Sequence, residues 1–140
     1  MTQAETVADT AALNDAVVAA RSAGTFGLDT EFMRERTYRA QLCLVQMSTP
    51  EKISIVDPLK ELDLEPIAGL LADPEVEVVV HAGRQDLELF HDEFSVVPTK
   101  VFDVQIAAGF AGFGASLSYG ALVKAVLGKT LVKGESYTDW

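Results

Sequence analysis

Apolar and polar residues follow one another along the first half of the chain in patterns that predict one helix and three strands. The strands are expected at residues 25–32, 41–48 and 52–57. The stretch 48–52 (STPEK) has the length of a hairpin turn, so the last two strands are expected to pair antiparallel. Residues 5–22 read as a loop and then a helix. Asp9 or Thr10 can cap this helix, and Gly24 ends it.

The second half of the chain alternates between strand and helix patterns. Residues 76–82 (VEVVVHA) form a continuous apolar run, which is typical of a central strand covered on both faces. Helices are expected at residues 64–73, 83–94 and 116–128, and residues 100–113 begin extended and turn helical. Antiparallel strands followed by strand–helix alternation predict one α/β domain, with a mixed sheet flanked by helices.

Two carboxylates interrupt the first predicted strand, FGLDTEF. Strand side chains alternate between faces, so Asp29 and Glu31 are expected to point the same way and to lie close together. Like charges at close range raise the pKa of each carboxyl group unless a cation lies between them. Apolar flanking residues such as Phe26 and Leu28 favour an internal strand over an edge strand with a solvated acidic face.

Two further acids follow predicted strands. Asp86 falls in the first turn of a helix, where the macrodipole stabilises a carboxylate whether or not it has a function. Asp103 is expected to cap the helix that begins at Val104. A D-x-E strand together with an acid at the mouth of a βα unit is a typical way to gather oxygen ligands for Mg²⁺ or Mn²⁺. A pair of such ions can activate water and clamp a phosphodiester.

Composition narrows the class of protein. The chain has 140 residues, 49% of them hydrophobic and 23% charged, as expected of one soluble domain. It contains no apolar run long enough for a membrane span and no signal peptide, and its single cysteine, Cys43, favours the cytoplasm. The net charge of −10 argues against nucleic-acid binding through the overall field but leaves room for a local phosphate-binding patch.

Phosphatases that form an aspartyl-phosphate are a rival interpretation of the acid pair, because they also place two acids at the end of a strand. Such enzymes need a general-acid Asp two residues after the nucleophile, where this chain has Glu31. They also need a downstream Lys and another acid pair, for which the sequence offers no good candidates. We therefore favour the metal-dependent interpretation.

The segment LDTEFMRERTYRAQLCLVQMS resembles the first motif region of the ribonuclease D group of 3′–5′ exonucleases. Its features D-T-E-F, an Arg, T-Y and L-x-L-x-Q occur in the order typical of that group. HAGRQDLELF resembles the second motif, whose acid falls on Asp86, and VFDVQIAAGFAGFG, SLSYGALVKAVLGKTL and TDW continue the likeness. The resemblance covers essentially the whole chain with matching spacing.

The resemblance implies an RNase H-like fold and a 3′–5′ exoribonuclease that acts by a two-metal mechanism on single-stranded RNA 3′ ends, such as those of tRNA precursors. By this likeness Asp29 bridges two Mg²⁺ or Mn²⁺ ions, Glu31 holds the ion with the attacking water, and Asp86 supports the second ion. The residues implied on the substrate side are Phe32, Arg34, Arg36, Tyr38, His81 and Gln85.

The chain departs from the group at its third motif, Y-x-x-x-D on a helix, because no tyrosine is followed by an acid four residues later. We therefore expect residues 1–140 to form an exonuclease domain that lacks this C-terminal helix and any downstream helical domains. Alone, such a chain is expected to be inactive, and to self-associate through the surface that the helix would cover. The alternative is a non-catalytic nucleic-acid-binding or scaffold module that retains the exonuclease fold.

Overall fold

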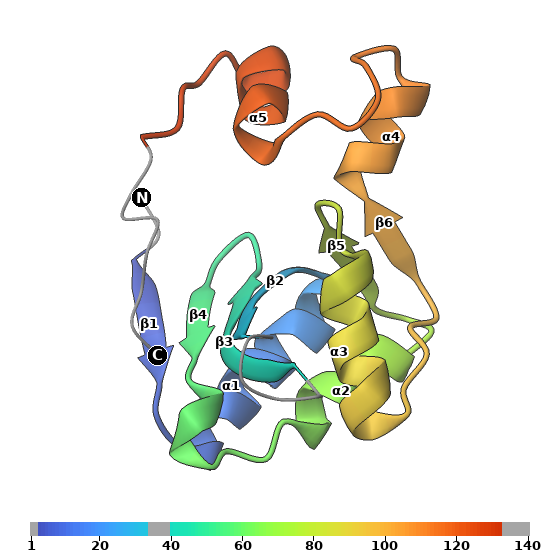
Figure 1. Cartoon of the computed structure of the whole chain (residues 1–140). Helices are drawn as coiled ribbons and strands as arrows, with labels where there is room; N and C mark the ends of the chain where they lie inside the picture. The colour runs from blue at the N-terminus through green and yellow to red at the C-terminus, as the bar shows by residue number, and fades with distance from the viewer. Residues whose placement is uncertain (1–2, 34–39, 133–140) are drawn as a thin grey trace.

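The computed structural model describes residues 3–33 and 40–132, and within them six strands form one mixed sheet (Figure 1). The strands are β1 (Ala4–Val7), β2 (Thr25–Met33), β3 (Gln41–Ser48), β4 (Ile53–Val56), β5 (Glu77–Val80) and β6 (Val101–Asp103). Their order across the sheet is β1-β4-β3-β2-β5-β6. The predicted α/β architecture, with antiparallel strands followed by parallel ones, is confirmed.

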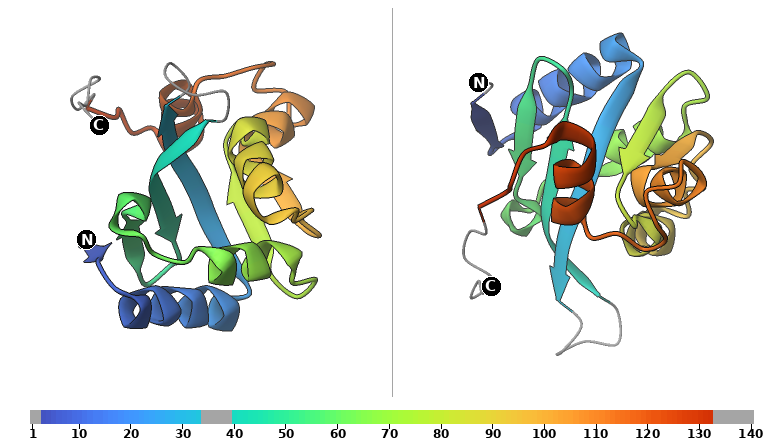
Figure 2. Two further views of the ribbon diagram at one scale, coloured as in Figure 1. Left: turned by 60° about the horizontal axis from the view of Figure 1, so that its bottom comes forward. Right: turned by 90° about the horizontal axis from the view of Figure 1, so that it is seen from above.

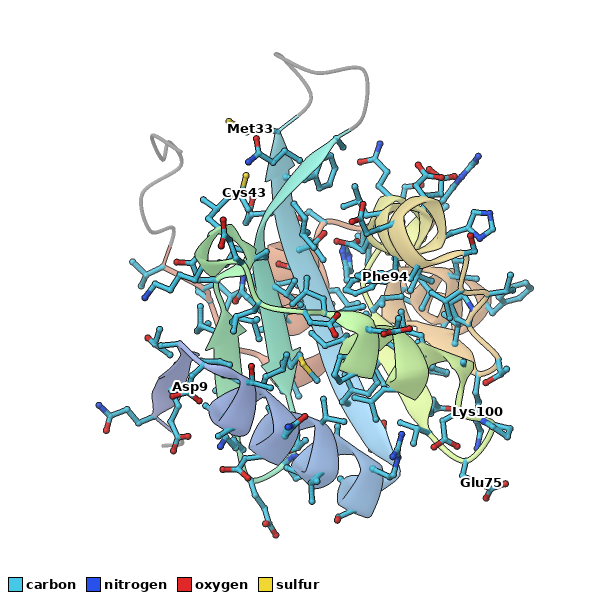
Figure 3. All side chains as sticks on the ribbon, turned by 90° about the horizontal axis from the view of Figure 1, so that it is seen from below. Asp9, Met33, Cys43, Glu75, Phe94 and Lys100 are labelled. Carbon is cyan, nitrogen blue, oxygen red and sulfur yellow. The ribbon has the colours of Figure 1, made fainter. Side chains whose placement is uncertain are left out.

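Helices lie on both sides of this sheet. They are α1 (Thr10–Ala23), the short 3-10 helix η1 (Pro58–Lys60), α2 (Glu65–Ala72), α3 (Arg84–Phe94), α4 (Val104–Phe110) and α5 (Tyr119–Leu127). Helices α1, α2 and α3 cover one face, as the view from below shows (Figure 3). Helix α5 lies on the opposite side, in front of β2 and β3 when the molecule is seen from above (Figure 2).

Strand β2 is internal, as its apolar flanks predict. It pairs antiparallel with β3 along most of its length and parallel with β5. The ladder between β2 and β5 ends at the pair Gly27 and Val79, so the second half of β2 extends past β5. This leaves one edge of β2 open to other partners just where its two acids lie.

The hydrophobic core lies between the sheet and helices α1, α2 and α3. Its fully buried side chains come from every layer, among them Leu13, Phe26, Val45, Ile67, Val78 and Phe90. On β2 the inward side chains alternate with outward ones, so Phe26, Leu28 and Thr30 are buried. Asp29 and Glu31 therefore lie on the face away from these helices.

Two features of the sheet differ from the sequence-based expectations. The segment Ala4–Val7, read as a loop, is a strand that pairs parallel with β4. Only the last residue of this segment is buried, so its sequence lacks the alternation of apolar and polar residues that predicts a strand. The segment is a strand because its main chain pairs with the free edge of β4. Strand β5 was expected to be covered on both faces, but its residues alternate between buried and half-buried.

The helix ends agree with the predicted capping residues. Between the two candidates for the first cap, the structure selects Asp9, whose side chain accepts a hydrogen bond from the Ala12 N–H. Gly24 and Gly128 end α1 and α5 in the left-handed conformation. None of the helices within residues 3–33 and 40–132 combines the length and apolar character needed to cross a bilayer.

Candidate active site

Strand β2 presents its two acids to solvent from the middle of the sheet. Asp29 and Glu31 are both exposed on the same face, as strand periodicity requires, and Thr30 between them points to the buried side. Strand β3 pairs with β2 at both acids, so the backbone that carries them is held on one side. Strand periodicity, which is a local property of the sequence, places the two side chains on one face.

Asp86 reaches the same strand from α3. Its Oδ1 accepts hydrogen bonds from the backbone N–H of Thr30, at 3.0 Å, and from the Thr30 hydroxyl. The backbone N–H is available because β5 no longer pairs with β2 at this point. Asp86 is buried, and both bonds use Oδ1. Asp86 is thus hydrogen-bonded to Thr30, the residue between Asp29 and Glu31 on β2.

The charge on these carboxylates is only partly compensated. Although Asp29 is exposed by its accessible surface, partial burial of its carboxyl group is the largest cause that raises its pKa above the usual 3.8, and the negative charges of Asp86 and Glu31 raise it further. The imidazole of His81 acts in the opposite direction. Asp29 therefore stands in a cluster of like charge, with His81 close enough to offset part of it. A site of this kind is suited to a cation.

Gln46 also belongs to the site, although the sequence-based set of site residues omits it. It lies opposite Asp29 in the β2–β3 ladder, and its Nε2 donates to Asp29 Oδ2 at 3.3 Å. The signal was present, since Gln46 is the last residue of the L-x-L-x-Q pattern. Only the register of β2 against β3 shows which side chain it faces.

The expected substrate-side residues are only partly brought together. His81 lies beside Asp29, whereas Gln85 is exposed in the first turn of α3, with no described hydrogen bond to the three acids. Phe32 is half-buried and follows Glu31 on β2. Arg34, Arg36 and Tyr38 lie outside the described residues.

A divalent metal ion can be tested against the donors in this site. Carboxylate oxygens are hard ligands of the kind that Mg²⁺ and Mn²⁺ prefer, and the raised pKa of Asp29 reflects excess negative charge. Within residues 3–33 and 40–132, however, no group of three or more His, Cys, Asp or Glu side chains is arranged so that it could hold a metal ion. The donor chemistry fits such an ion, but the described residues do not form a closed set of ligands.

The turn between β5 and α3 depends on the absence of a side chain at Gly83. A Cβ at this position would lie 2.4 Å from Val80 Cβ, and Val80 is part of the core. Gly83→Ala is therefore expected to lower the free energy of unfolding by about 1–3 kcal/mol, the usual cost of overpacking.

Gly69→Ala is the matched control for this prediction. Gly69 lies within α2, and a Cβ there would meet no atom within 4 Å. Helix propensity predicts that this change is neutral or stabilises the fold by up to about 1 kcal/mol. Urea unfolding of both variants measures the difference, and equal midpoints would contradict the crowded turn.

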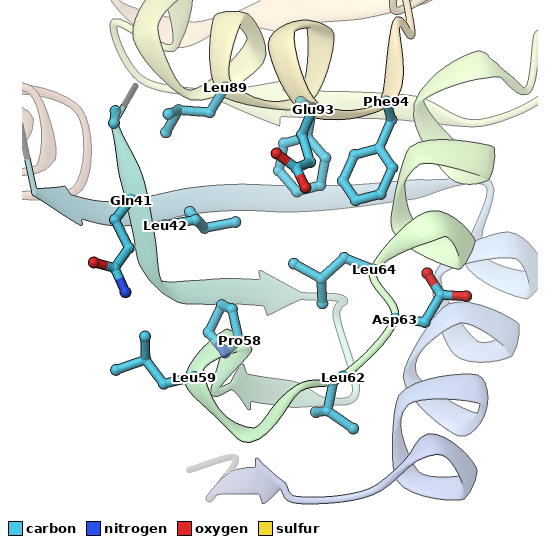
Figure 4. A pocket seen from close by; sticks show the side chains of 12 residues that line it. Gln41, Leu42, Pro58, Leu59, Leu62, Asp63, Leu64, Leu89, Glu93 and Phe94 are labelled. Carbon is cyan, nitrogen blue, oxygen red and sulfur yellow. The ribbon is translucent and has the colours of Figure 1, made fainter. Parts of the chain in front are cut away.

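A cleft near the helical face lies away from the acids. It has a volume of about 470 Å³ and is enclosed by η1, the start of β3 and the C-terminal half of α3 (Figure 4). Leu42, Pro58 and Phe94 are among its lining residues, and none of the three candidate acids is. The candidate chemistry is therefore confined to the opposite face and the open edge of β2.

The chain is similar to a family of known nucleases and to several of its members. The profile of a family described as 3′-5′ exonuclease matches residues 4–140. Ribonuclease D of Granulibacter bethesdensis is 46% identical over 114 residues, which cover 81% of this chain and 29% of that protein. Ribonuclease D of Escherichia coli is 41% identical over 122 residues, which cover 87% of this chain and 32% of that protein. The chain thus spans about a third of the length of these curated relatives.

The crystal structure of Escherichia coli RNase D has the same fold. It matches with a TM-score of 0.90 and 37% sequence identity, over 99% of this chain and 37% of that chain. The mixed sheet, its helices and the acids of β2 therefore define an RNase H-like domain of the nuclease class. The chain belongs to the 3′–5′ exonuclease family, and its resemblance to the ribonuclease D group is confirmed.

Proposed function

We propose that this domain hydrolyses phosphodiester bonds at the 3′ ends of single-stranded RNA, with precursors such as those of tRNA as substrates. The observation that carries the proposal is the convergence of Asp29, Glu31 and Asp86 on the open half of β2. Its relatives support the reaction type, since the solved Escherichia coli RNase D is described as an exoribonuclease involved in structured RNA processing. A cytoplasmic location is part of the proposal, and the free buried thiol of Cys43 is consistent with it.

The proposed cofactor is Mg²⁺ or Mn²⁺, in keeping with the divalent ions that this family generally uses. Asp29 would be the central ligand of these ions, and Glu31 and Asp86 would supply further carboxylate ligands on either side of it. When bound, such ions lower the pKa of water and stabilise the charge that develops on the phosphate and the leaving oxygen.

The chain's own residues prepare this site before a cofactor enters. Thr30 fixes one oxygen of Asp86 through two hydrogen bonds, so that carboxylate has a defined orientation at the edge of β2. Gln46 donates one hydrogen bond to Oδ2 of Asp29. His81 offsets part of the negative charge around Asp29. Together these contacts hold two of the three carboxylates in place, which lowers the cost of organising the site.

The substrate-binding part of the proposal rests on residues around the end of β2. Phe32 directly follows the acids, and Arg34, Arg36 and Tyr38 come next in sequence. Aromatic side chains stack on bases and arginines contact phosphates, which is how single strands are held without sequence preference. His81 and Gln85 are assigned to the same substrate-binding part of the site.

The direction of degradation tests the proposed function. RNA labelled at its 5′ end and incubated in Mg²⁺ with a longer form of the protein that includes a Y-x-x-x-D helix is expected to shorten stepwise, because hydrolysis removes nucleotides from the 3′ end. Circular RNA of the same sequence is the control and should stay intact. Shortening from the 5′ end or cleavage of the circle would contradict the assignment, and RNA binding without any cleavage would favour the alternative of a non-catalytic binding module.

We also propose that the chain self-associates through an apolar surface on α4 and α5. A groove of about 350 Å³ between these helices is lined almost entirely by apolar side chains, including Phe113, Leu122 and Val126. Phe110 on α4 is 92% exposed. None of the 21 acidic residues falls within residues 104–132, so charge repulsion is weakest at this surface.

Sedimentation velocity tests the self-association. The wild-type chain is expected to gain mass with concentration in the micromolar range, and Val126→Asp is expected to stay monomeric because it places a charge in the groove. Val18→Asp is the matched control, since Val18 is exposed to a similar degree on α1. A wild-type chain that remains monomeric at all concentrations would rule out the contact.

A further inference from the structure

The carboxylate of Asp103 binds two separate segments of backbone. Its Oδ1 accepts hydrogen bonds from the N–H groups of Gln105, at 2.9 Å, and Ile106, at 3.4 Å, and so caps α4 as the sequence predicts. The same oxygen accepts the N–H of Ala82 at 3.1 Å, and Oδ2 accepts the N–H of Gly83 at 3.0 Å. The residue is therefore more than a helix cap.

The ionised form of Asp103 is the form that these contacts require. Partial burial alone would raise the pKa of its carboxyl group, but the N–H groups of Gly83 and Ala82, followed by those of Gln105 and Ile106, lower it below 3.8. At neutral pH the carboxylate is charged and can serve both segments at once.

The turn that Asp103 contacts consists of Ala82 and Gly83, and few other contacts stabilise it. Ala82 adopts a left-handed conformation with φ of 51°, which is strained for a residue with a side chain. Gly83 is the N-cap residue of α3, where it supplies no side-chain capping bond, and it is buried. A buried N–H without a partner is costly, so the bond from Gly83 to Asp103 is central to this turn.

The same turn positions two members of the candidate site. His81 lies directly before it, and Asp86 lies in the first turn of α3 directly after it. A shift of the turn would move the imidazole relative to Asp29 and would loosen the bonds from Asp86 to Thr30.

A second link from α4 reaches His81 itself. The carbonyl oxygen of Leu117 accepts hydrogen bonds from His81 Nε2, at 2.9 Å, and from Gln105 Nε2, at 3.0 Å. A carbonyl only accepts, so Nε2 of His81 carries a proton in this contact. The ring of Tyr119 packs edge-on against His81, with centroids 5.5 Å apart. The first turn of α4 thus holds the imidazole both through the turn and through the Leu117 carbonyl.

We propose that Asp103 and Gln105 are positioning residues of the candidate site, which act through the turn at Ala82 and Gly83 and through Leu117 to fix His81 and the start of α3. Neither residue touches the acids, so they are not catalytic residues. Their importance for hydrolysis rests on the proposed function, whereas their effect on the geometry of the site can be measured without any activity.

Asp103→Asn separates the two tasks of this side chain. Asparagine caps helices as well as aspartate does, so Oδ1 can continue to serve α4. Its NH₂ group replaces Oδ2 and places a donor against the N–H of Gly83. Asp9→Asn is the matched control, because Asp9 caps α1 through Ala12 and has no contact with the site.

Nuclear magnetic resonance of the 140-residue chain at pH 8 is the test. In wild-type protein and in Asp9→Asn, we expect a ring N–H signal from His81 Nε2 and slow exchange of the Thr30 amide. In Asp103→Asn, the His81 signal should be lost and the Thr30 and Gly83 amides should exchange at least about tenfold faster, while the Gln105 amide is unchanged. His91 is an internal reference, because its Nδ1 pairs with the Val96 carbonyl.

Equal His81 signals and Thr30 exchange in Asp103→Asn and Asp9→Asn would overturn the proposal and leave Asp103 as a helix cap only. If Asp103→Asn does not fold, Gln105→Leu takes its place, with Asn14→Leu on the exposed side of α1 as its control. Loss of the His81 signal in Gln105→Leu alone supports the proposal, and an unchanged signal refutes it. A failure of the RNA assay would leave these results untouched.

Discussion

Replacing Asp29 with asparagine is expected to abolish RNA trimming and, at the same time, to make the fold more stable at neutral pH. The proposed site loses its central ligand, so the rate should fall by more than about 10²-fold, in any form of the protein that trims RNA. Calorimetry should show that Mn²⁺ binding is lost as well. The fold should gain stability because the charge on Asp29 is unfavourable where it stands.

The direction of the stability change follows from the raised pKa of Asp29. Burial, then Asp86 and Glu31, make the folded state hold this proton more tightly than the unfolded state, whose pKa is near 3.8. Between 3.8 and the raised value the folded chain binds more protons, so stability falls as pH rises through that window. Above this window, including at pH 7, the fold has lost all of the stability that protonated Asp29 provides. Below pH 3.8 it has lost none. Asparagine carries no charge at any pH and removes the loss.

Thermal unfolding at two pH values measures this effect. Asp29→Asn should have a higher Tm than wild type at pH 7, and the difference should shrink as the pH approaches 3. Asp15→Asn is the matched control, because Asp15 is exposed on α1, remote from the acids of β2. An Asp29→Asn protein that keeps its Mn²⁺ affinity would remove the metal assignment, and a lower Tm at pH 7 would contradict the electrostatic cluster.

The 140-residue chain assayed alone is expected to trim RNA at least about 10²-fold more slowly than a longer form that includes a Y-x-x-x-D helix. The group that it resembles uses the tyrosine to orient or deprotonate the attacking water and the acid as a fourth ligand. Residues 1–140 contain no such motif, and residues 3–33 and 40–132 form no group of acids that could hold a metal ion. Loss of a water-positioning group typically lowers the rate by a factor of about 10² to 10⁴.

Parallel assays of the two forms on one 5′-labelled RNA test this expectation. The longer form can be a chimera in which the residues that follow this domain come from Escherichia coli ribonuclease D. Equal rates, with both activities lost in Asp29→Ala, would show that the third motif is not needed. Tyr137 or Asp139 would then be the first residues to examine for the missing role.

The sequence determined the elements and the face on which the first two acids lie. Strand periodicity is a local property of the backbone, so D-x-E in an apolar strand places Asp29 and Glu31 side by side before any tertiary contact is known. Capping is equally local, which is why Asp103 and Gly128 could be assigned to helix ends. The segment of β1 could not be found in this way, because its strand structure comes from pairing with the edge of β4, more than forty residues away.

Tertiary structure alone decided which of these residues meet. The bonds from Thr30 to Asp86, from Gln46 to Asp29 and from Gly83 to Asp103 join residues that are 56, 17 and 20 positions apart. Such pairs depend on strand register, on where the β2–β5 ladder ends and on how α3 packs, and none of these is written in a local pattern. A sequence motif can name the acids of the site, but the partners that orient them are selected only when distant segments fold against one another.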